Sequence, residues 1–597
     1  MLLAPRLRIR RGVSPNLDQV KHVGTLAPAV LLGLCLQSSA VLATSAGPNA
    51  DEPKSPAMSV DPATRSSSLA QIDRHNVNQL EPVFTFRTGR LGAQGSAPLI
   101  RGDKLLVLSA FPHTLFAIGL ARSNGTLSWQ FSPTANRVAD GLHCCDRTHL
   151  GPVAVGDRIY FSTLDGHVVA VDAEHDTPVW DVAVADPGQG ETLASAPTAA
   201  AAELIVGNAG DDYGARGWIA ALDRATGRTL WKHYSTGPDQ DVGISADFKP
   251  AGPRDQGSHS WPGTAWQHGG GSVSGWISYD PRLQLVFHDT GPPAPWNPDP
   301  RPGDNRWTSG VFARDARTGE ARWFVGLHPH ALFPWRNGSA NLLLDHTWEG
   351  APRALLVHPD ADGRLYVIDR QTGKILAADS YISYPRVARR ASAEQTPRTN
   401  VQVRDVCPAW PGALGGDAAL DQTTGRLYLP VSRLCMDLEG RSANYLQGTA
   451  FIGANVRVTS SNESDGAVVA WDVISRRAVW SIRERFPVAS DVLVTAGGLV
   501  FYGTLDGRLK AVDAQSGTPL WQFGTSAPIT GQPTTFVGPD GRQYVAVVAG
   551  ASGPYGLAQQ AWIDRRDATA ARGLARVIAN VGRPRDPSGT LYVFGLP

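Results

Sequence analysis

Residues 505–521 read LDGRLKAVDAQSGTPLW, and this stretch determines the fold because close copies of it recur along the chain. Residues 508–512 carry small and branched side chains that suit a short strand. Residues 513–517 supply turn formers, and residues 518–523 can return as a second strand. The stretch therefore predicts a β-hairpin with a tryptophan on its returning strand.

The copies keep an aspartate and a tryptophan at a constant interval. Four are clear: HVVAVDAEHDTPVW (167–180), WIAALDRATGRTLW (218–231), VFARDARTGEARW (311–323) and AVVAWDVISRRAVW (467–480). Two are looser, with Ala121 in the aspartate position of 115–129 and Ala377 in the tryptophan position of 365–377. A hairpin with an apolar face on each side is unstable alone, so repeats of all-β units stack and close into a ring. We expect an all-β propeller in which the tryptophans wedge between neighbouring blades.

Composition agrees with a large β protein and excludes one class of partner. The 597 residues include 63 Gly and 44 Pro, which suit short strands joined by turns, and one large propeller would use nearly all of them. Lys and Arg number 55 against 54 Asp and Glu, a formal net charge of +1. Without a basic field, the chain is not expected to bind nucleic acid.

The N-terminus has the pattern of an export signal. Arginines precede the uncharged run 23–43, and small residues follow it, which predicts a signal peptide over 1–46; an uncleaved membrane anchor is the alternative. Residues 47–75 are rich in Pro, Ser and charge and predict a flexible lead-in, leaving 76–597 as a single propeller domain. We expect a periplasmic protein with no transmembrane segment after signal removal.

The order of strands suggests how the ring closes. Residues 83–87, 97–100 and 104–108 alternate as a first blade would, and the strand at 590–597 has nothing after it. We expect this last strand to complete the blade begun by the N-terminal segment, which removes an open edge. Long insertions are expected on one rim, where a site would form; they are 131–148, 236–270, 292–308, 383–416 and 433–464.

Four cysteines remain after signal removal, an even number that favours two disulfides in an exported chain. Cys407 and Cys435 flank an insertion and suit an ordinary disulfide. The adjacent Cys144 and Cys145 can join only through a strained ring; two buried thiols, or one cysteine with a distant partner, remain open. Because the chain has no CxxCH, a covalently attached haem is not expected.

Long segments resemble the periplasmic PQQ-dependent (quinoprotein) methanol and alcohol dehydrogenases over about residues 70–597. The segments are HCCDRT, LDGHVVAVDAE, YGARGWIAALDRATGRTLWKHYSTGPDQD, AWQHGGGS, PAPWNPDPRPGDNRWTS, HPDADGRLYVIDRQTG, CMDLE and GLVFYGTLDGRLKAVDAQSG. The resemblance implies an eight-bladed propeller with long rim insertions. It also implies a quinone on the axis, against a disulfide between adjacent cysteines, with Ca²⁺ or a lanthanide as Lewis acid and a carboxylate base.

Few of the family's working positions carry over. Cys144 and Cys145 match the adjacent disulfide, Ser272 keeps a hydroxyl beside the quinone, and Asp212 stands where the family has a metal-binding glutamate. Pro292 stands in place of the metal-binding asparagine, and Pro334 in place of the catalytic base. The family's further cofactor and catalytic anchors fall on Gly95, Leu150, Ala194, Ala209, Ser274, Ala361, Gly415 and Ala489.

These replacements remove charge partners that PQQ and its metal need. Burying the three carboxylates of PQQ without partners costs several kcal/mol per charge. One certain carboxylate is too few for the metal. We therefore expect an exported, non-catalytic relative without a cofactor, which binds an unidentified small molecule or protein partner, although the resemblance leaves open whether it is an enzyme.

Two other readings remain. An active PQQ- and Ca²⁺- or lanthanide-dependent alcohol dehydrogenase would need rearranged ligands, for which Asp211, Asp289 and Asp360 are candidates; Asp211 and Asp212 are more simply a solvated loop pair. An enzyme with other chemistry could gather His328, His330 and His358 around a metal, although histidines beside proline at strand ends are more often structural.

Overall fold

The computed structural model describes residues 60–91, 95, 97–120, 125–142, 151–249, 255–335, 341–384, 402–460, 464–550, 553, 555, 570–579, 581, 584, 586 and 588–597. All of them belong to the unit formed by residues 54–597. The expected signal peptide (1–46), residues 47–59 of the lead-in, and Cys144, Cys145 and Leu150 lie outside the described residues.

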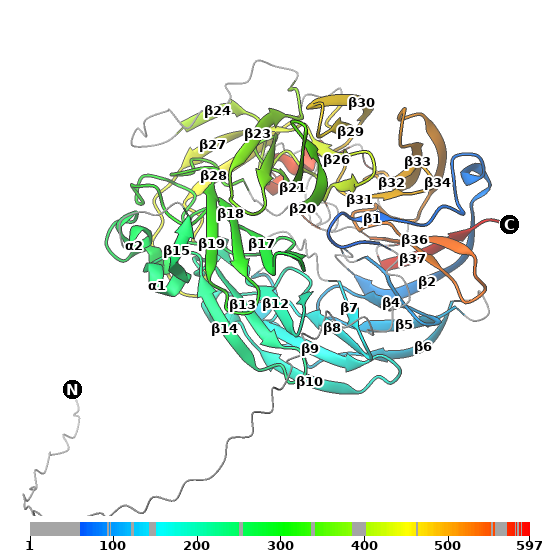
Figure 1. Ribbon diagram of the computed structural model, residues 1–597, viewed down its shortest axis with the longest axis horizontal. Helices are drawn as coiled ribbons and strands as arrows, with labels where there is room; N and C mark the ends of the chain where they lie inside the picture. The colour runs from blue at the N-terminus through cyan, green and yellow to red at the C-terminus, as the bar shows by residue number, and fades with distance from the viewer. Residues whose placement is uncertain are drawn as a thin grey trace, which may run out of the picture. The chain divides into compact units, whose positions relative to one another are not determined.

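In these residues, eight four-stranded antiparallel units follow one another in chain order around a common centre (Figure 1). The first four contain β3 (Leu99–Arg101), β4 (Lys104–Leu108), β5 (Leu115–Gly119) and β6 (Thr126–Phe131); β7 (Val153–Val155), β8 (Arg158–Ser162), β9 (His167–Asp172) and β10 (Pro178–Ala183); β11 (Thr198–Ala200), β12 (Glu203–Gly207), β13 (Trp218–Asp223) and β14 (Thr229–Tyr234); β16 (Ser278–Asp280), β17 (Leu285–Thr290), β18 (Gly310–Asp315) and β19 (Ala321–Gly326). The last four contain β20 (Leu342–Trp348), β21 (Ala351–Pro359), β22 (Arg364–Asp369) and β23 (Ile375–Ser380); β25 (Ala419–Asp421), β26 (Arg426–Ser432), β29 (Gly466–Asp472) and β30 (Arg477–Glu484); β31 (Val492–Thr495), β32 (Leu499–Gly503), β33 (Arg508–Asp513) and β34 (Pro519–Gly524); β35 (Thr534–Val537), β36 (Gln543–Ala549), β37 (Ser588–Gly595) and β2 (Glu81–Leu91). The expected all-β propeller is confirmed.

Further elements decorate these blades. Strand β1 (Ser66–Ser67) pairs with β31 and β15 (Ile244–Lys249) pairs with β19, both in parallel. The described helical segments are α1 (Asp239–Val242), α2 (Gln256–His259), α4 (Leu574–Val577), η1 (Val77–Gln79), η2 (Arg137–Ala139), η4 (Pro187–Gln189), η5 (Asp211–Tyr213), η6 (Ala265–His268) and η7 (Ala570–Gly573). None of the helices in the described ranges is long and apolar enough to cross a membrane.

The hydrophobic core lies between neighbouring blades. Leu106 of β4 and Ala117 of β5, for example, pack in one cluster with Ile159 of β8 and Val169 of β9, and all four are fully buried. The middle strands are therefore apolar along both faces, whereas the outer strand β10 alternates between exposed and half-buried residues. Each blade therefore buries its apolar side chains against its neighbours.

The clear copies of the Asp–Trp repeat join their blades to the blades that follow. Trp323 Nε1 donates a hydrogen bond to the carbonyl of Arg370 at 3.0 Å, across the boundary to the following blade. Asp369 shapes the turn that receives the ring by accepting the amides of Gln371 and Thr372. Gly373 in this turn has φ 72°, and a Cβ there would lie 2.8 Å from Trp323. The same bond joins Trp180 to Arg224, Trp231 to Ala316 and Trp480 to Ala514, which confirms the expected wedges.

The chain closes the ring with its own ends. Strand β2 pairs with β37 from Glu81↔Gly595 to Leu91↔Ser588, and Trp521 Nε1 donates to the Leu80 carbonyl at 3.1 Å. In Figure 1 the blue N-terminal strands accordingly lie beside the red C-terminal strand. The expected closure is confirmed, but the strand at 83–87 belongs to this closing blade and not with β3 and β4, as the alternation had suggested. Pairing it with β37 covers an edge that would otherwise be open.

Part of the expected flexible lead-in is packed at the centre of the ring. The first strands of successive blades contact one another and so line the centre, where β1 adds beside β31 and β25. Arg65, only 2% exposed, pairs with Asp417 at 3.2 Å and Asp491 at 2.7 Å. The assignment of residues 60–75 to a flexible segment was therefore wrong, because two buried carboxylates far along the chain hold the guanidinium in place.

Two of the insertions together form a sheet of their own, which their weak periodicity did not predict. Strands β24 (Gln402–Val406), β27 (Cys435–Gly440) and β28 (Ala454–Thr459) pair in the order β24–β27–β28. The disulfide between Cys407 and Cys435 joins the end of β24 to the start of β27, which confirms that prediction.

Candidate functional site

The two adjacent aspartates of η5 are buried beside a glycine-rich segment. Asp211 and Asp212 are 4% and 3% exposed, and Asp211 accepts a hydrogen bond from the Ser272 amide at 2.8 Å. The backbones pack closely here, since a Cβ on Gly217 would lie 1.9 Å from the carbonyl oxygen of Gly271. The expectation of a solvated loop pair was wrong, because this approach seals Asp211 against Ser272.

The described positions assigned to lost catalytic groups are buried. Pro292 and Pro334 are buried, and so are Ala361 and Ala489. The last two belong to one apolar cluster, whose members include Phe333, Trp335, Trp410, Phe486, Leu505 and Ile578. Charged side chains at these two positions would face an apolar environment.

Gly415, another position assigned to a lost cofactor group, has no room for a side chain. A Cβ on Gly415 would lie 1.9 Å from the carbonyl oxygen of Val488, the residue before Ala489. Real Cβ atoms do not approach backbone oxygen this closely, so the segment around Val488 occupies the space that an asparagine side chain would need. Ala194 and Ala209 are also buried, at 2% and 1% exposure.

A polar network lies between the β16–β19 and β20–β23 blades; it consists of Asp289, Asn341, His358, Asp360 and His328. Asn341 Nδ2 donates to Asp289 at 2.6 Å, and its Oδ1 lies 3.0 Å from His358 Nδ1. His358 Nε2 lies 3.4 Å from Asp360, whose other oxygen is 2.8 Å from His328 Nε2. Buried polar groups of this kind must satisfy one another.

The network favours charged histidines. Burial opposes a charge on His358, but the carboxylates of Asp289 and Asp360 outweigh it and raise its pKa. Burial likewise opposes a charge on His328, and Asp360 raises its pKa above the ordinary value. For Asp289, burial raises the pKa to about 6.

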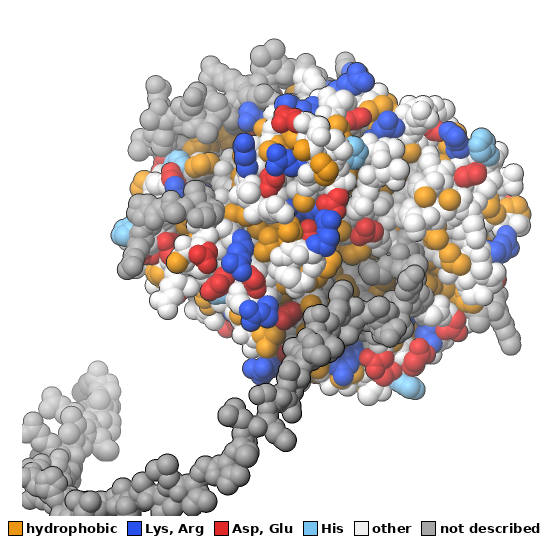
Figure 2. All heavy atoms as spheres, in the orientation of Figure 1, with side chains coloured by type: hydrophobic (Ala, Val, Ile, Leu, Met, Phe, Trp, Pro, Cys, Tyr) orange, Lys and Arg blue, Asp and Glu red, His pale blue; other side chains and the backbone are white. Residues whose placement is uncertain are grey.

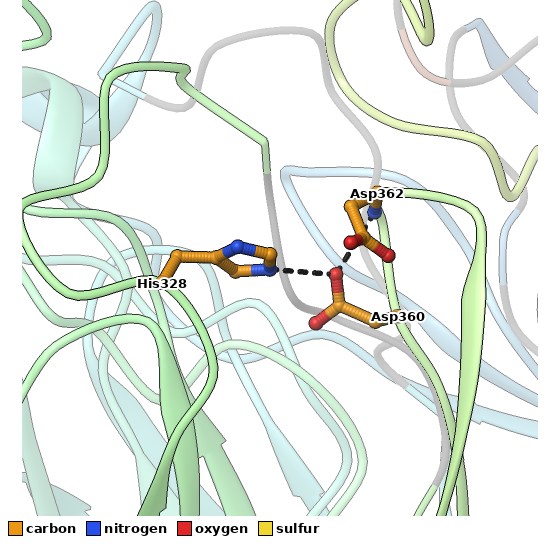
Figure 3. A group of neighbouring side chains, drawn as sticks. All are labelled: His328, Asp360 and Asp362. Atoms are coloured by element: carbon orange, nitrogen blue, oxygen red, sulfur yellow. Dashed lines mark hydrogen bonds and ion pairs between the residues drawn. The ribbon is translucent and has the colours of Figure 1, made fainter. Parts of the chain in front are cut away.

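His328, Asp360 and Asp362 form a group with the donors of a metal site (Figure 3). One donor atom from each lies within 4.8 Å of the others. His328 follows β19, whereas the aspartates lie in the turn between β21 and β22. Figure 3 shows the imidazole and the carboxylate of Asp360 pointing toward each other, with Asp362 alongside.

The structure gathers only part of the predicted histidine set. His328 and His358 both contact Asp360, but His330 points elsewhere, with Nδ1 2.9 Å from the carbonyl oxygen of Gly303. Sequence reasoning missed Asp362. The Asp-x-Asp spacing of 360–362 was the available signal, since a tight turn brings such a pair together.

Comparison with known proteins identifies the family of this chain. The family description "Glucose/ethanol/alcohol dehydrogenase, beta-propeller domain", labelled PQQ, matches residues 59–399 and 482–545. The chain belongs to the PQQ-dependent alcohol and methanol dehydrogenase family. It is 37% identical over 558 residues to the "Lanthanide-dependent methanol dehydrogenase" of Methylacidiphilum fumariolicum, covering 89% of this chain and 90% of that protein.

Other relatives agree over most of their length. The chain is 33% identical over 615 residues to "Methanol dehydrogenase [cytochrome c] subunit 1" of Paracoccus denitrificans, which covers 97% of this chain and 96% of that one. A solved "Europium-containing methanol dehydrogenase" superposes with a TM-score of 0.86 and 36% identity, covering 91% of this chain and 99% of that chain. The propeller of this family is thus present nearly in full.

The described residues at the positions that the family resemblance assigns to the cofactor do not fit PQQ. The quinone needs partners for three carboxylates, yet Ala361 and Ala489 pack in the apolar cluster and Gly415 lies against the Val488 carbonyl. Of the matched residues, Ser272 uses its amide to bond Asp211, and Asp212 remains the one carboxylate at a matched metal position. We derive no catalytic step through PQQ at this site.

Proposed function

We propose that this chain is an exported, periplasmic member of the PQQ-dependent dehydrogenase family that does not oxidise alcohols through PQQ and serves as a binding or accessory protein. The observation that carries this proposal is the apolar packing of Ala361 and Ala489 with Phe333, Trp335 and Trp410. Arg572 lies over Trp296 and Trp410 of this cluster and would pair with at most one carboxylate, so the remaining charges of the cofactor would be buried at a cost of several kcal/mol each.

The alternative, an active enzyme with rearranged metal ligands, has less support. Two of its candidate carboxylates already have partners within the protein: Asp211 bonds the Ser272 amide, and Asp289 bonds Asn341. Recruiting them to a metal beside Asp212 would break these bonds, and each broken buried bond carries a desolvation penalty of about 1–3 kcal/mol.

The surface gives a guide to the kind of partner. On the face in Figure 2, Lys and Arg side chains lie among Asp and Glu side chains rather than in a field of one sign. This distribution supports a neutral small molecule or a protein over nucleic acid, as the net charge also indicates.

A reconstitution experiment tests the proposal. The purified protein is mixed with PQQ and either Ca²⁺ or La³⁺, freed of excess cofactor, and examined for a quinone absorbance band, for alcohol-dependent dye reduction and for its melting temperature. We expect no stoichiometric band, no dye reduction and an unchanged melting temperature, because a tight ligand stabilises the fold that binds it.

The lanthanide-dependent methanol dehydrogenase of M. fumariolicum, treated in the same way, is the positive control. A stoichiometric band together with alcohol-dependent dye reduction in this chain would overturn the proposal. Recovery of the protein in the cytoplasmic fraction of its host would contradict the export part separately.

A further inference from the structure

We propose that His328, Asp360 and Asp362 bind one divalent transition-metal cation, for which Zn²⁺ is the best-fitting probe. One imidazole nitrogen and two carboxylate oxygens form a borderline donor set of the kind that Zn²⁺ accepts. The site uses neither Asp212 nor Pro292, the positions matched to the family's own metal ligands.

The distances between the donors suit such an ion after small movements. His328 Nε2 lies 2.8 Å from Asp360 Oδ1, and the Asp362 donor lies within 4.8 Å of both. Metal–ligand bonds of about 2.0–2.2 Å separate neighbouring donors by roughly 3–4 Å. Binding therefore needs small rotations of the side chains and the release of the His328 Nε2 proton to solvent.

The backbone and neighbouring groups hold the three ligands in place. The His328 amide bonds the Ser309 carbonyl, and its ring meets Trp335 edge to face at 6.0 Å. The Asp360 amide donates to the Arg364 carbonyl at 2.7 Å, and the Arg364 amide donates back to Asp362 at 2.7 Å. His358, 3.4 Å from the second oxygen of Asp360, supplies the kind of outer contact that orients metal ligands.

Charge also favours a cation at this place. Two carboxylates lie close together in the turn, and Arg364 pairs with one of them, Asp362, at 3.7 Å. The two carboxylates share one short turn, so their negative charges repel each other. A bound cation would relieve this repulsion. The ion can also reach the site, because the side chains of His328 and Asp362 are 19% and 13% exposed.

The site stands where the family's catalytic groups are missing. Ala361, in place of an arginine, lies between the two aspartates, and Pro334, in place of the base, precedes the Trp335 that packs on His328. Because one donor is nitrogen, the site should prefer transition metals over Ca²⁺ and lanthanides, which take oxygen ligands. This inference goes beyond the proposed function and does not depend on the outcome with PQQ.

The test measures Zn²⁺ binding by the metal-free full chain. Isothermal titration with Zn²⁺ is run beside titrations with Ca²⁺ and La³⁺, and elemental analysis gives the stoichiometry. We expect one Zn²⁺ per chain, a higher melting temperature with Zn²⁺, and weaker binding of Ca²⁺ and La³⁺. His328→Asn and Asp362→Asn should each weaken Zn²⁺ binding by about 100-fold or more.

His330→Asn is the matched control, since it removes an imidazole two residues away that bonds the Gly303 carbonyl. It should leave Zn²⁺ binding unchanged. Absence of saturable Zn²⁺ binding, undiminished binding in His328→Asn and Asp362→Asn, equal loss in His330→Asn, or preference for La³⁺ would each overturn the proposal. Circular dichroism of the metal-free variants confirms folding, and Asp362→Asn, the more exposed position, keeps the test available if His328→Asn does not fold.

Discussion

His328 illustrates how a single residue acquires its chemistry from the folded chain. Its neighbours in sequence are Leu327 and Pro329, which give it no charge partner. In the structure it faces the carboxylates of Asp360 and Asp362, with Arg364 beyond them. The carboxylate of Asp360 raises its pKa against the opposing effect of burial.

We predict that this residue makes stability depend on pH. A histidine whose folded-state pKa is raised binds more protons in the folded than in the unfolded state above pH 6.5, so its contribution is complete below 6.5 and is lost as pH rises through the folded pKa. The contribution of His328 is the free energy of unfolding of the wild type minus that of His328→Asn, both measured with a chelator present. This difference should fall by up to about 1.4 kcal/mol per pH unit in that window.

Urea denaturation at intervals between pH 5.5 and 8.5 measures this difference. A difference for His328→Asn that rises with pH would contradict the prediction.

The repeated hairpin is the element on which the propeller depends. Its aspartate shapes a turn, its glycine leaves a flat surface, and the tryptophan of the preceding blade lies on that surface and bonds a carbonyl. The eighth blade has no copy of the repeat on its outer edge, because β2 from the N-terminus forms that edge. Seven copies are thus enough for eight blades.

We predict that Gly373→Ala destabilises the protein more than Gly350→Ala does. Both glycines have positive φ, 72° and 84°, so alanine meets the same backbone strain of about 1–2 kcal/mol at each. Only at Gly373 would the new Cβ meet Trp323, at 2.8 Å, while nothing lies within 4 Å of the position at Gly350. Overpacking should add about 1–3 kcal/mol at Gly373 alone.

Denaturant midpoints of the two variants give the comparison directly. Equal losses would mean that the tryptophan does not depend on the glycine, and the wedge would then contribute little to blade docking.

At the scale of the whole molecule, the ends of the chain hold the ring together. Strand β37 lies between β36 and β2, and Phe594 is fully buried in a cluster with Ile72, Phe501 and Val547. At the centre, ion pairs of Arg65 with Asp417 and Asp491 also join the N-terminal segment to later blades. Because a closed ring has no free edge, a substitution that weakens the packing of β37 against its neighbours should destabilise every blade.

We predict that Phe594→Ala lowers the stability of the whole propeller by about 3–5 kcal/mol, the usual cost of a large cavity in a core. Scanning calorimetry should show one transition at a lower temperature. Val537→Ala, at a 40% exposed position in the same blade, should change the melting temperature little. A separate transition at lower temperature, with the remaining blades unaffected, would show that the blade closed by β2 and β37 unfolds independently and would contradict the prediction.

The sequence by itself determined the propeller, the tryptophan wedges, the closure by the last strand and the Cys407–Cys435 disulfide. These features depend on spacings of a few residues or on a repeated pattern, so the local sequence of each copy is enough to specify its hairpin. The replacements at Pro292, Pro334 and Ala361 are a prediction from the family resemblance, based on the intact motifs that flank them.

Only the tertiary structure decided that Arg65 is anchored at the centre, that Asp211 is sealed against Ser272, and that Asp362 joins His328. Each of these contacts joins segments far apart in the sequence, where no local pattern records the partner. Their energies depend on burial, and burial is set by the packing of blades around the ring. A charge that looks solvated in the sequence can therefore become a buried ion pair or a ligand in the fold.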